Sequence, residues 1–294
     1  MKFKIVFAFA TIYVVWGSTY LGIQYAIQTI PPLMMISTRF LVAGAILYAF
    51  CRWRGMPAPT GREWKASFFL GSLMMLGGTG GVSVAEQTVP SGLTALLICI
   101  TPLWIALIER VRPNGRRTTR LEMIGIVIGL GGVAMLVGQD GLPIGSHVDF
   151  FGAGLVLASS FCWSLGTVLS KGASTPSSPF MATAAQMLAG GVALAAASLL
   201  RGEANDLHLE AISIESVVAL IYLIVPGSLL AFSAYIWLIR VVPPSKVATY
   251  AYVNPVIALL LGWAMAGEHL SLMSILAALV IVGAVVMVVS MKKK

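Results

Sequence analysis

The stretch VVWGSTYLGIQYA, residues 14–26, lies in the first apolar segment of the chain, yet it is rich in small, polar and aromatic side chains. A helix that faces only lipid would be dominated by Leu, Ile and Val. Within this stretch, WGSTYLGIQYA from Trp16 aligns with WSLGTVLSKGA from Trp163 in the second half of the chain. The two segments are therefore candidates for equivalent helices in two related halves.

The composition of the chain places it in a membrane. Of its 294 residues, 58% are hydrophobic and 10% are charged, whereas soluble domains have about 25% charged residues. Apolar runs recur from one end of the chain to the other, and each is long enough to cross a bilayer as a helix. We predict an all-α membrane protein with ten transmembrane helices, at residues 5–28, 32–51, 66–87, 91–110, 121–138, 150–170, 179–200, 216–239, 244–264 and 271–291.

The distribution of basic residues predicts the orientation of these spans. If the N-terminus is cytoplasmic, all 19 Lys and Arg residues except Arg39 and Arg201 fall on the cytoplasmic side, as the positive-inside rule requires. The net charge of +8 is thus explained by orientation, and it gives no reason to expect a nucleic-acid partner. An even number of spans places both termini in the cytoplasm.

The two halves align over more than one predicted helix. The spacing that separates the two tryptophans also separates Pro32 from Pro179. Further along, VPSGLTALLICITPLWIAL from Val89 aligns with VPPSKVATYAYVNPVIALL from Val242. Collinear matches with paired prolines are not expected if membrane segments merely share an apolar composition, so they favour an internal repeat.

The predicted repeat is inverted with respect to the membrane. Residues 1–138 and 150–294 each contain five predicted spans. Because five is an odd number, the second half crosses the bilayer in the opposite sense to the first. Inverted-topology repeats are typical of secondary transporters, which bind their solute near the midplane and alternate access between its two sides.

Four stretches resemble a known family: VVWGSTYLGIQYA, PPLMMISTRFLVAGAIL, VAEQTVPSGLTALLICITPLW and ATYAYVNPVIALLLGWAMAGEHLS. They are similar to the drug/metabolite transporter (DMT) superfamily, in its ten-helix EamA-type branch, and the similarity covers nearly the whole chain. This resemblance implies a multi-pass carrier of the bacterial inner (plasma) membrane, usually an exporter of amino acids, metabolites or drugs. Substrates vary widely within the branch, so the resemblance names none.

Arg39 is the only basic residue deep inside a predicted span. An arginine at that depth is costly and normally faces a cavity or a charged partner. Glu86 lies at a comparable depth and could form a structural ion pair with it. Alternatively, the guanidinium could receive a substrate carboxylate through two parallel hydrogen bonds.

Two prolines lie near the middle of predicted spans. Pro102 and Pro255 occupy equivalent positions in the two halves. A proline inside a helix frees the carbonyl four residues before it, here those of Ile98 and Ala251, and kinks the helix. The two residues are candidates for hinges beside the cavity or for static kinks.

Polar and aromatic side chains within the spans are candidates for the wall of the solute pathway. Aromatic residues can instead form a belt at the membrane interface or pack between helices, but Trp16, Trp163 and Tyr250 lie nearer the middle of their spans. Aromatic walls with few charges suit flat, partly apolar solutes. We predict a substrate-binding site formed by Trp16, Thr19, Gln24, Arg39, Glu86, Gln87, Trp163, Thr167, Gln186, Tyr235, Tyr250, Tyr252 and Asn254.

The leading functional prediction is a secondary transporter. It would export small metabolites such as amino acids, especially aromatic ones, or drug-like solutes. The alternative within transport is an antiporter of nucleotide sugars or other phosphorylated metabolites, although a single deep arginine offers little to a phosphate. An intramembrane enzyme is disfavoured because the predicted spans contain no histidine and no converging nucleophile and base. A channel would not explain the inverted repeat.

The expected partners are a small-molecule substrate and the lipid bilayer, with no cofactor, no metal and no nucleic acid. The three cysteines and three histidines lack metal-ligand spacing. Proton coupling normally requires a carboxylate or a histidine inside the membrane, and only Glu86 and Glu109 are candidates. We therefore favour facilitated diffusion or exchange and leave proton coupling open. Gly125 and Gly129 allow close helix packing, within a monomer or at the seam of a homodimer.

Overall fold

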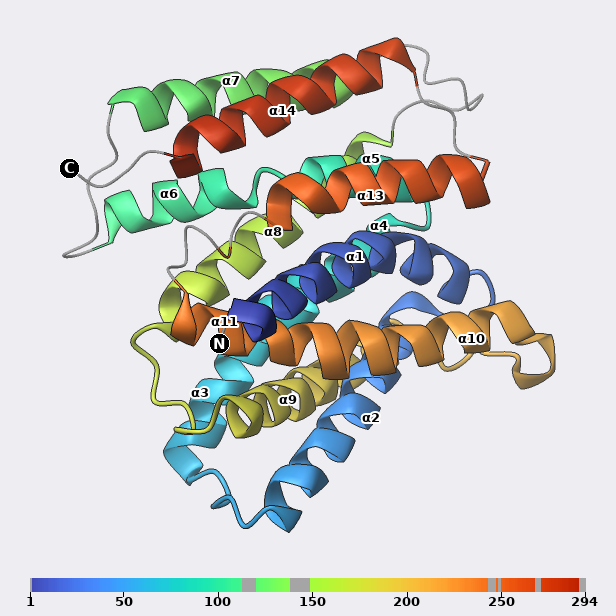
Figure 1. Cartoon of the computed structure of the whole chain (residues 1–294). Coiled ribbons are helices and arrows are strands. Elements are labelled where there is room, and N and C mark those ends of the chain that lie inside the picture. Colours follow the sequence, from blue (N-terminus) through green and yellow to red (C-terminus); the bar gives the residue numbers. More distant parts are fainter. Residues whose placement is uncertain are drawn as a thin grey trace.

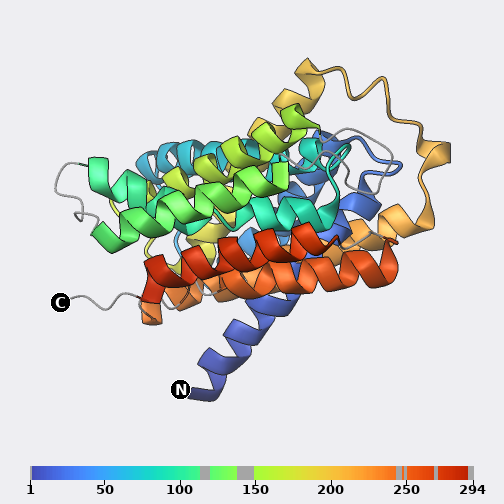
Figure 2. The same ribbon diagram turned by 90° about the horizontal axis from the view of Figure 1, so that it is seen from above.

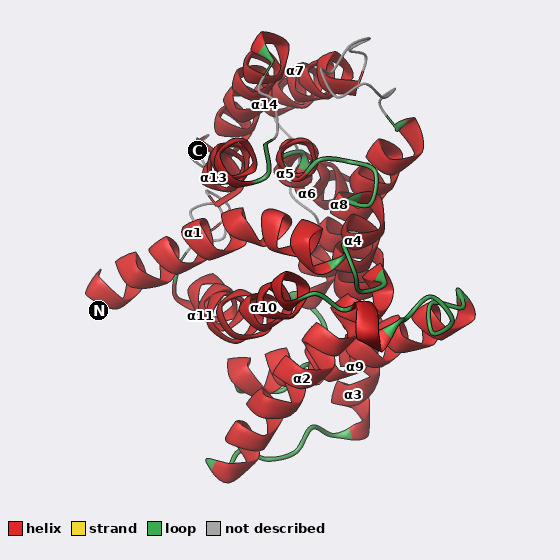
Figure 3. Ribbon diagram, turned by 90° about the vertical axis from the view of Figure 1, so that its right-hand side faces the viewer, coloured by secondary structure: helices red, strands yellow, loops and turns green. Residues whose placement is uncertain are grey.

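The computed structural model of the chain describes residues 2–112, 120–137, 149–242, 247, 250–267 and 271–290. Every regular element in this part of the chain is a helix (Figure 3), which confirms the all-α prediction. The elements are α1 (Lys2–Ala26), α2 (Pro32–Trp53), α3 (Gly61–Gly71), η1 (Ser72–Gly80), α4 (Gly81–Ala85), α5 (Ser91–Ile98), α6 (Thr101–Val111), α7 (Arg120–Val137), α8 (Phe150–Ser170), α9 (Pro179–Leu200), η2 (Leu209–Ala211), α10 (Ile214–Tyr222), η3 (Leu223–Phe232), α11 (Ser233–Val241), α13 (Tyr250–Met265) and α14 (Leu272–Ser290).

Seven helical stretches of the described residues are long and apolar enough to cross a bilayer. They lie at the first four predicted spans and at the sixth, seventh and eighth. Val253–Met265 and Ile275–Ala284 are shorter apolar helices at the positions of the last two predicted spans, and α7 lies at the fifth. The count of ten spans and the inverted repeat therefore stay predictions.

Helix starts follow from local sequence chemistry. Pro32 and Pro179 occupy the first turn of α2 and α9, where a missing N–H costs no hydrogen bond. Asp149 caps α8 by accepting from the amide of Phe151 at 3.0 Å. The hydroxyl of Thr88 donates to the other oxygen of the Asp149 carboxylate at 2.5 Å and, as the largest cause, lowers the pKa of that carboxyl below its ordinary value.

Helices from the two halves of the chain pack against each other throughout the bundle. α2 lies along α9, and α7 lies along α14 (Figure 1). α1 packs against α13 and η3, while α8 packs against α6 and η1. The start of α1 and the end of α14 both lie toward the left in Figures 1 and 2. Each half thus depends on the other for much of its packing.

Two long helices contain a π-helical segment at corresponding places. η1 lies between α3 and α4, and η3 lies between α10 and α11. A π-helix shifts the backbone hydrogen bonds from the i−4 to the i−5 carbonyl and often marks a functional site. Both segments line the interior of the bundle, because η1 packs on α8 and α9 and η3 packs on α1 and α2.

The two candidate hinge prolines have different surroundings. Pro102 lies in the first turn of α6, after α5 has ended at Ile98, so the span is broken just before the proline. The carbonyl of Ile98, which the sequence predicts to be freed, accepts a hydrogen bond from the Thr101 hydroxyl at 2.6 Å. Pro255 lies inside the continuous helix α13, as predicted. Their action as hinges stays a prediction.

Two helix backbones come very close where α3 crosses α9. A methyl group on Gly71 would lie 2.6 Å from the carbonyl oxygen of Gln186 and 2.8 Å from the amide nitrogen of Gly190. Because these atoms are backbone, the two helices would have to separate to admit a side chain. Gly71 therefore fixes the distance between a helix of the first half and one of the second.

Gly71→Ala is expected to destabilise the protein by roughly 1–3 kcal/mol through overpacking. Gly154→Ala is the matched control, because Gly154 also lies within a helix but has no neighbouring atom within 4 Å of the added methyl group. The midpoint of thermal unfolding in detergent can be followed with a thiol-reactive dye, since Cys51 and Cys99 are buried. Equal midpoints for the two variants would contradict the requirement for close approach at Gly71.

Candidate functional site

A cavity of about 110 Å³ lies inside the bundle, between the two halves of the chain. Its lining comes from α1, α2, η1, α4, α6, α8, η3 and α13, with Ile98 at the end of α5. The lining residues are Trp16, Thr19, Tyr20, Ile23, Arg39, Phe40, Gly78, Thr79, Val82, Ile98, Thr101, Ser159, Ser160, Trp163, Phe232, Tyr250 and Asn254.

Trp16 is the centre of an aromatic cluster beside this cavity. Its ring lies 5.0 Å from that of Tyr235 and 5.3 Å from that of Tyr250, measured between centroids. The rings of Trp163 and Phe232 each lie 6.2 Å from it, and the Trp16–Trp163 pair is edge-to-face with an interplanar angle of 88°. These geometries are favourable for aromatic pairs. The cluster joins five helical segments from both halves: α1, α8, η3, α11 and α13.

Both tryptophans of the aligned segments lie against a π-helix of the opposite half. The indole N–H of Trp16 donates to the carbonyl of Gly227 in η3 at 3.3 Å. Trp163 covers Gly78 in η1, where an added methyl group would lie 3.2 Å from the Trp163 ring. Glycine at position 78 lets the Trp163 ring reach the backbone of η1, and a methyl group on Gly227 would instead lie 3.2 Å from the Arg39 guanidinium and 3.3 Å from the Thr19 side chain.

The glycines of the opening stretch serve close packing. A methyl group on Gly17 would lie 2.8 Å from the side chain of Ile257 in α13, and one on Gly22 would lie 3.2 Å from Leu223 in η3. The amide of Asn254 is best satisfied with its nitrogen donating to the carbonyls of Tyr250 and Tyr13, at 3.1 and 3.2 Å. α1 is thus held between α13 and η3, with its cavity-facing residues in between.

Arg39 is buried in the cavity wall, with 5% of its surface exposed. Its Nε donates to the hydroxyl of Ser228 in η3 at 2.8 Å. The guanidinium carbon also lies 5.1 Å from the centroid of the Phe40 ring, within the range of a cation–π contact. These contacts fix the guanidinium between α2 and η3, and the pairing with Glu86 stays a prediction.

Five hydroxyl-bearing residues of the cavity lining are absent from the predicted site: Tyr20, Thr79, Thr101, Ser159 and Ser160. Ser159 donates to the carbonyl of Leu155 at 2.7 Å, and Ser160 donates to that of Leu157 at the same distance. The Thr101 hydroxyl donates to the carbonyl of Ile98 at the end of α5. Serine and threonine in membrane helices commonly satisfy their hydroxyls this way, so their type carries little signal. Only the helical packing shows that they face the cavity.

Six of the predicted site residues line the cavity: Trp16, Thr19, Arg39, Trp163, Tyr250 and Asn254. Tyr235 is buried behind it in the aromatic cluster. The others among the described side chains lie elsewhere. Thr167 donates to the carbonyl of Trp163 at 2.8 Å, and Gln186 is buried at the crossing of α9 and α3.

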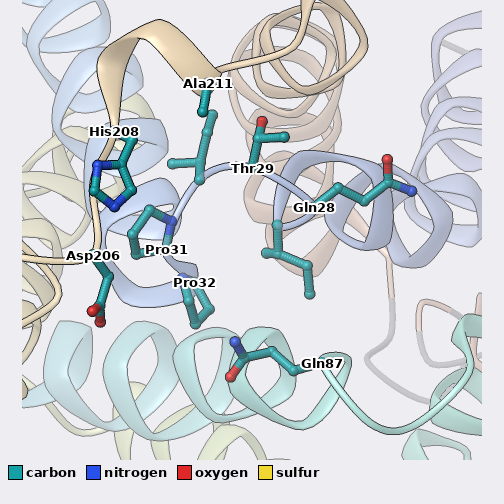
Figure 4. A pocket seen from close by; sticks show the side chains of 10 residues that line it. Gln28, Thr29, Pro31, Pro32, Gln87, Asp206, His208 and Ala211 are labelled. Carbon is teal, nitrogen blue, oxygen red and sulfur yellow. The ribbon is translucent and has the colours of Figure 1, made fainter.

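The remaining predicted residues lie near the ends of α1 and α4 or outside the described residues. Gln24 is half-buried on α1, and its side-chain oxygen has no hydrogen-bond partner in the part of the chain that the structure describes. Glu86 is buried at the end of α4. Gln87 lines a second, outer recess of about 300 Å³ (Figure 4). The side chain of Tyr252 lies outside the described residues.

Metal ligands do not gather in the described structure. Among the residues in the described ranges, no group of three or more His, Cys, Asp and Glu side chains could hold a metal ion. The central cavity instead offers aromatic rings, hydroxyls and one guanidinium. These groups can bind a solute by stacking, hydrogen bonding and charge pairing.

The whole chain matches a family of transporters. The EamA-like transporter family matches residues 3–138 and 150–290, one match in each half. The chain therefore belongs to the EamA-like transporter family of the DMT superfamily, as the resemblance of its sequence predicted, and it is a multi-pass membrane protein.

Relatives of similar length support this membership. The chain is 41% identical over 283 residues to the inner membrane transporter YedA of Escherichia coli (strain K12), covering 96% of this chain and 89% of YedA. It is 25% identical over 279 residues to the transporter YoaV of Bacillus subtilis (strain 168), covering 95% and 94%. A solved crystal structure shares the fold with a TM-score of 0.67 at 20% identity, covering 97% of this chain and 96% of that one.

Trp16→Ala is expected to lower the stability of the folded protein by roughly 3–5 kcal/mol, because it leaves a cavity where four aromatic rings meet. Trp53→Ala is the matched control, since Trp53 is 79% exposed at the end of α2. Thermal unfolding of both variants can be followed by circular dichroism. If Trp16→Ala unfolded at the same temperature as Trp53→Ala, Trp16 would not hold the cluster together.

Proposed function

We propose that this chain is a secondary carrier that exports flat, partly apolar solutes bearing a carboxylate, such as aromatic amino acids, by alternating access. The observation that carries the proposal is the central cavity, where aromatic rings from both halves surround one buried guanidinium. The rings offer stacking surfaces, and Arg39 offers the planar fork that matches a carboxylate. The inner membrane of a bacterium is the location, as for YedA.

The pattern of helix packing supports two inverted halves, residues 1–138 and 150–294. Several of the main helix contacts have a counterpart when the halves are exchanged. α1 packs on α13 and η3, whereas α8, the equivalent of α1, packs on α6 and η1. α2 packs on its own equivalent α9, and α7 on α14. If the two halves exchange their conformations, the bundle has two related arrangements, one open to each side of the membrane. Alternating access requires two such arrangements.

The small volume of the cavity supports a closed state. Sites for small molecules usually have about 300–1,000 Å³, which is more than the 110 Å³ found here. A bound solute therefore requires the surrounding helices to move apart. The π-helical segments η1 and η3 line this space and are suited to such movement, because their hydrogen bonding departs from that of the flanking helices.

The charges in the cavity favour a carboxylate over a phosphate. Arg39 is the one basic side chain in the cavity lining that the structure describes, and a phosphorylated solute would normally require several. Exchange or facilitated diffusion is the proposed mode of coupling. Glu109, one candidate for proton coupling, lies in an ion pair with Lys171 at 3.3 Å.

Counterflow into proteoliposomes tests the proposal. Vesicles preloaded with an unlabelled aromatic amino acid are expected to accumulate the labelled compound transiently, whereas vesicles preloaded with a nucleotide sugar are not. The Trp16→Ala variant serves as a control with a disrupted cavity, and empty vesicles give the background. Counterflow with the nucleotide sugar alone would replace the proposal by the alternative substrate class.

Arg39→Lys is expected to reduce counterflow of the carboxylate solute at least about tenfold, because it keeps the charge but loses the bidentate hydrogen bonds. Counterflow of the corresponding amide, which lacks the carboxylate, is expected to change little. Ser228→Ala is expected to have an intermediate effect, since Ser228 only orients the guanidinium. Normal transport of the carboxylate by a folded Arg39→Lys variant would exclude bidentate recognition.

A further inference from the structure

The outer recess collects polar groups from three connections of the chain (Figure 4). Gln28 and Thr29 come from the link between α1 and α2, and Gln87 follows α4. Asp206 and His208 come from the segment between α9 and η2. With histidine counted as neutral, Asp206 is the one formally charged side chain among the described residues that line the recess.

A second carboxylate nearby is already engaged. Glu203 is buried, and its two oxygens accept hydrogen bonds from the amides of Leu33 and Met34 in the first turn of α2, at 3.2 and 2.8 Å. Ser198 donates to it at 2.9 Å. Glu203 therefore neutralises the positive end of the α2 dipole. Asp206, which is exposed, keeps its charge available to the recess.

The recess begins where the cavity-facing side of α1 ends. Trp16, Tyr20 and Ile23 line the cavity and are four and three residues apart, so they share one face of α1. Ile27 lines the recess and continues this face just past the end of the helix, because it follows Ile23 by four residues and its amide donates to the carbonyl of Ile23 at 2.9 Å. Ile30, which also lines the recess, lies in the link to α2.

A plug of apolar side chains separates the two spaces. Ile23 and Val82 are buried, with 3% and 6% of their surfaces exposed, and they belong to one packed core with Ile30 and Leu33. Ile27 packs against the same core. The cavity is thus closed toward the recess by packed apolar side chains.

We propose that the recess is a second solute site, which binds a primary ammonium group at Asp206 with the amide of Gln87 as a hydrogen-bond partner. A carboxylate attracts an ammonium group, and the amide oxygen of Gln87 can accept one of its remaining N–H bonds. The recess is the outer end of the solute pathway, and this role rests on the proposed function. A solute is thus recognised by its amine when it is in the recess and by its carboxylate when it is in the central cavity.

A cysteine reporter in the recess tests the site without requiring transport. Gln87→Cys places a thiol in the lining, and the parent chain gives the background labelling of its three cysteines. A trimethylammonium-bearing methanethiosulfonate is expected to modify this thiol faster than the sulfonate-bearing reagent, by about threefold to tenfold after correction for intrinsic reactivity, since the Asp206 carboxylate attracts the cation. Asp206→Asn is expected to remove the preference.

Protection by simple probes identifies the ligand class. Phenethylammonium is expected to slow the modification of the reporter thiol, whereas 3-phenylpropionate, with a similar ring and chain and the opposite charge, is not. Glu210→Gln is the matched control for Asp206→Asn, because Glu210 is an exposed acid of η2 that does not line the recess. Gln28→Cys reports from another segment if Gln87→Cys fails to fold.

Equal protection by the two probes, or unchanged protection in Asp206→Asn, would overturn the outer site. Selective protection that is lost in Asp206→Asn and kept in Glu210→Gln would establish it. The two proposals fail separately. Selective protection without counterflow would refute the carrier function and leave the outer site in place. Counterflow without selective protection would refute the outer site and leave the carrier function in place.

Discussion

The structure depends on the contact of one indole ring with the opposite half of the chain. Trp16 lies where α1, α8, η3, α11 and α13 meet, and its ring packs against four other aromatic rings. Its N–H bonds a carbonyl of η3, so the ring is fixed in orientation as well as position. In a bilayer, apolar packing gains nothing from water exclusion against lipid, and shape-matched contacts and hydrogen bonds must hold helices together. The Trp16 ring, where five segments meet, supplies both the shape-matched contacts and a hydrogen bond.

Small residues make these contacts possible. Gly17, Gly71, Gly78 and Gly227 all lie where a side chain would meet an atom of a helix in the opposite half. Two of them belong to the π-helical segments, where an indole ring or a guanidinium comes close to the backbone. The same glycine positions therefore produce both the close packing and the cavity. A glycine admits a side chain from another helix, and the place of that side chain determines where the cavity lies beside it.

Charge is sparse along the proposed pathway, and each charge has a distinct place. Arg39 is held by Ser228 in the central cavity, and Asp206 lies in the outer recess. Between them lies an apolar plug. A charge buried in the plug would require a partner or would raise the barrier to every solute. The arrangement keeps the closed state stable through packing and leaves recognition to the two ends.

The membrane class, the helical fold, the family and most helix boundaries can be predicted from the amino-acid sequence, because each follows from local composition, proline position or alignment. The sequence also predicts that Trp16, Trp163 and Arg39 belong to one site, since their types are unusual for their depth. The packing of the helices is needed to show that Ser159 and Ser160 face the cavity and that Gln186 and Thr167 do not line it. Serine and threonine satisfy their hydroxyls on their own helix, so their side chains give no sign of what they face. That depends on the rotation of each helix against its neighbours, which contacts between residues distant in the sequence determine.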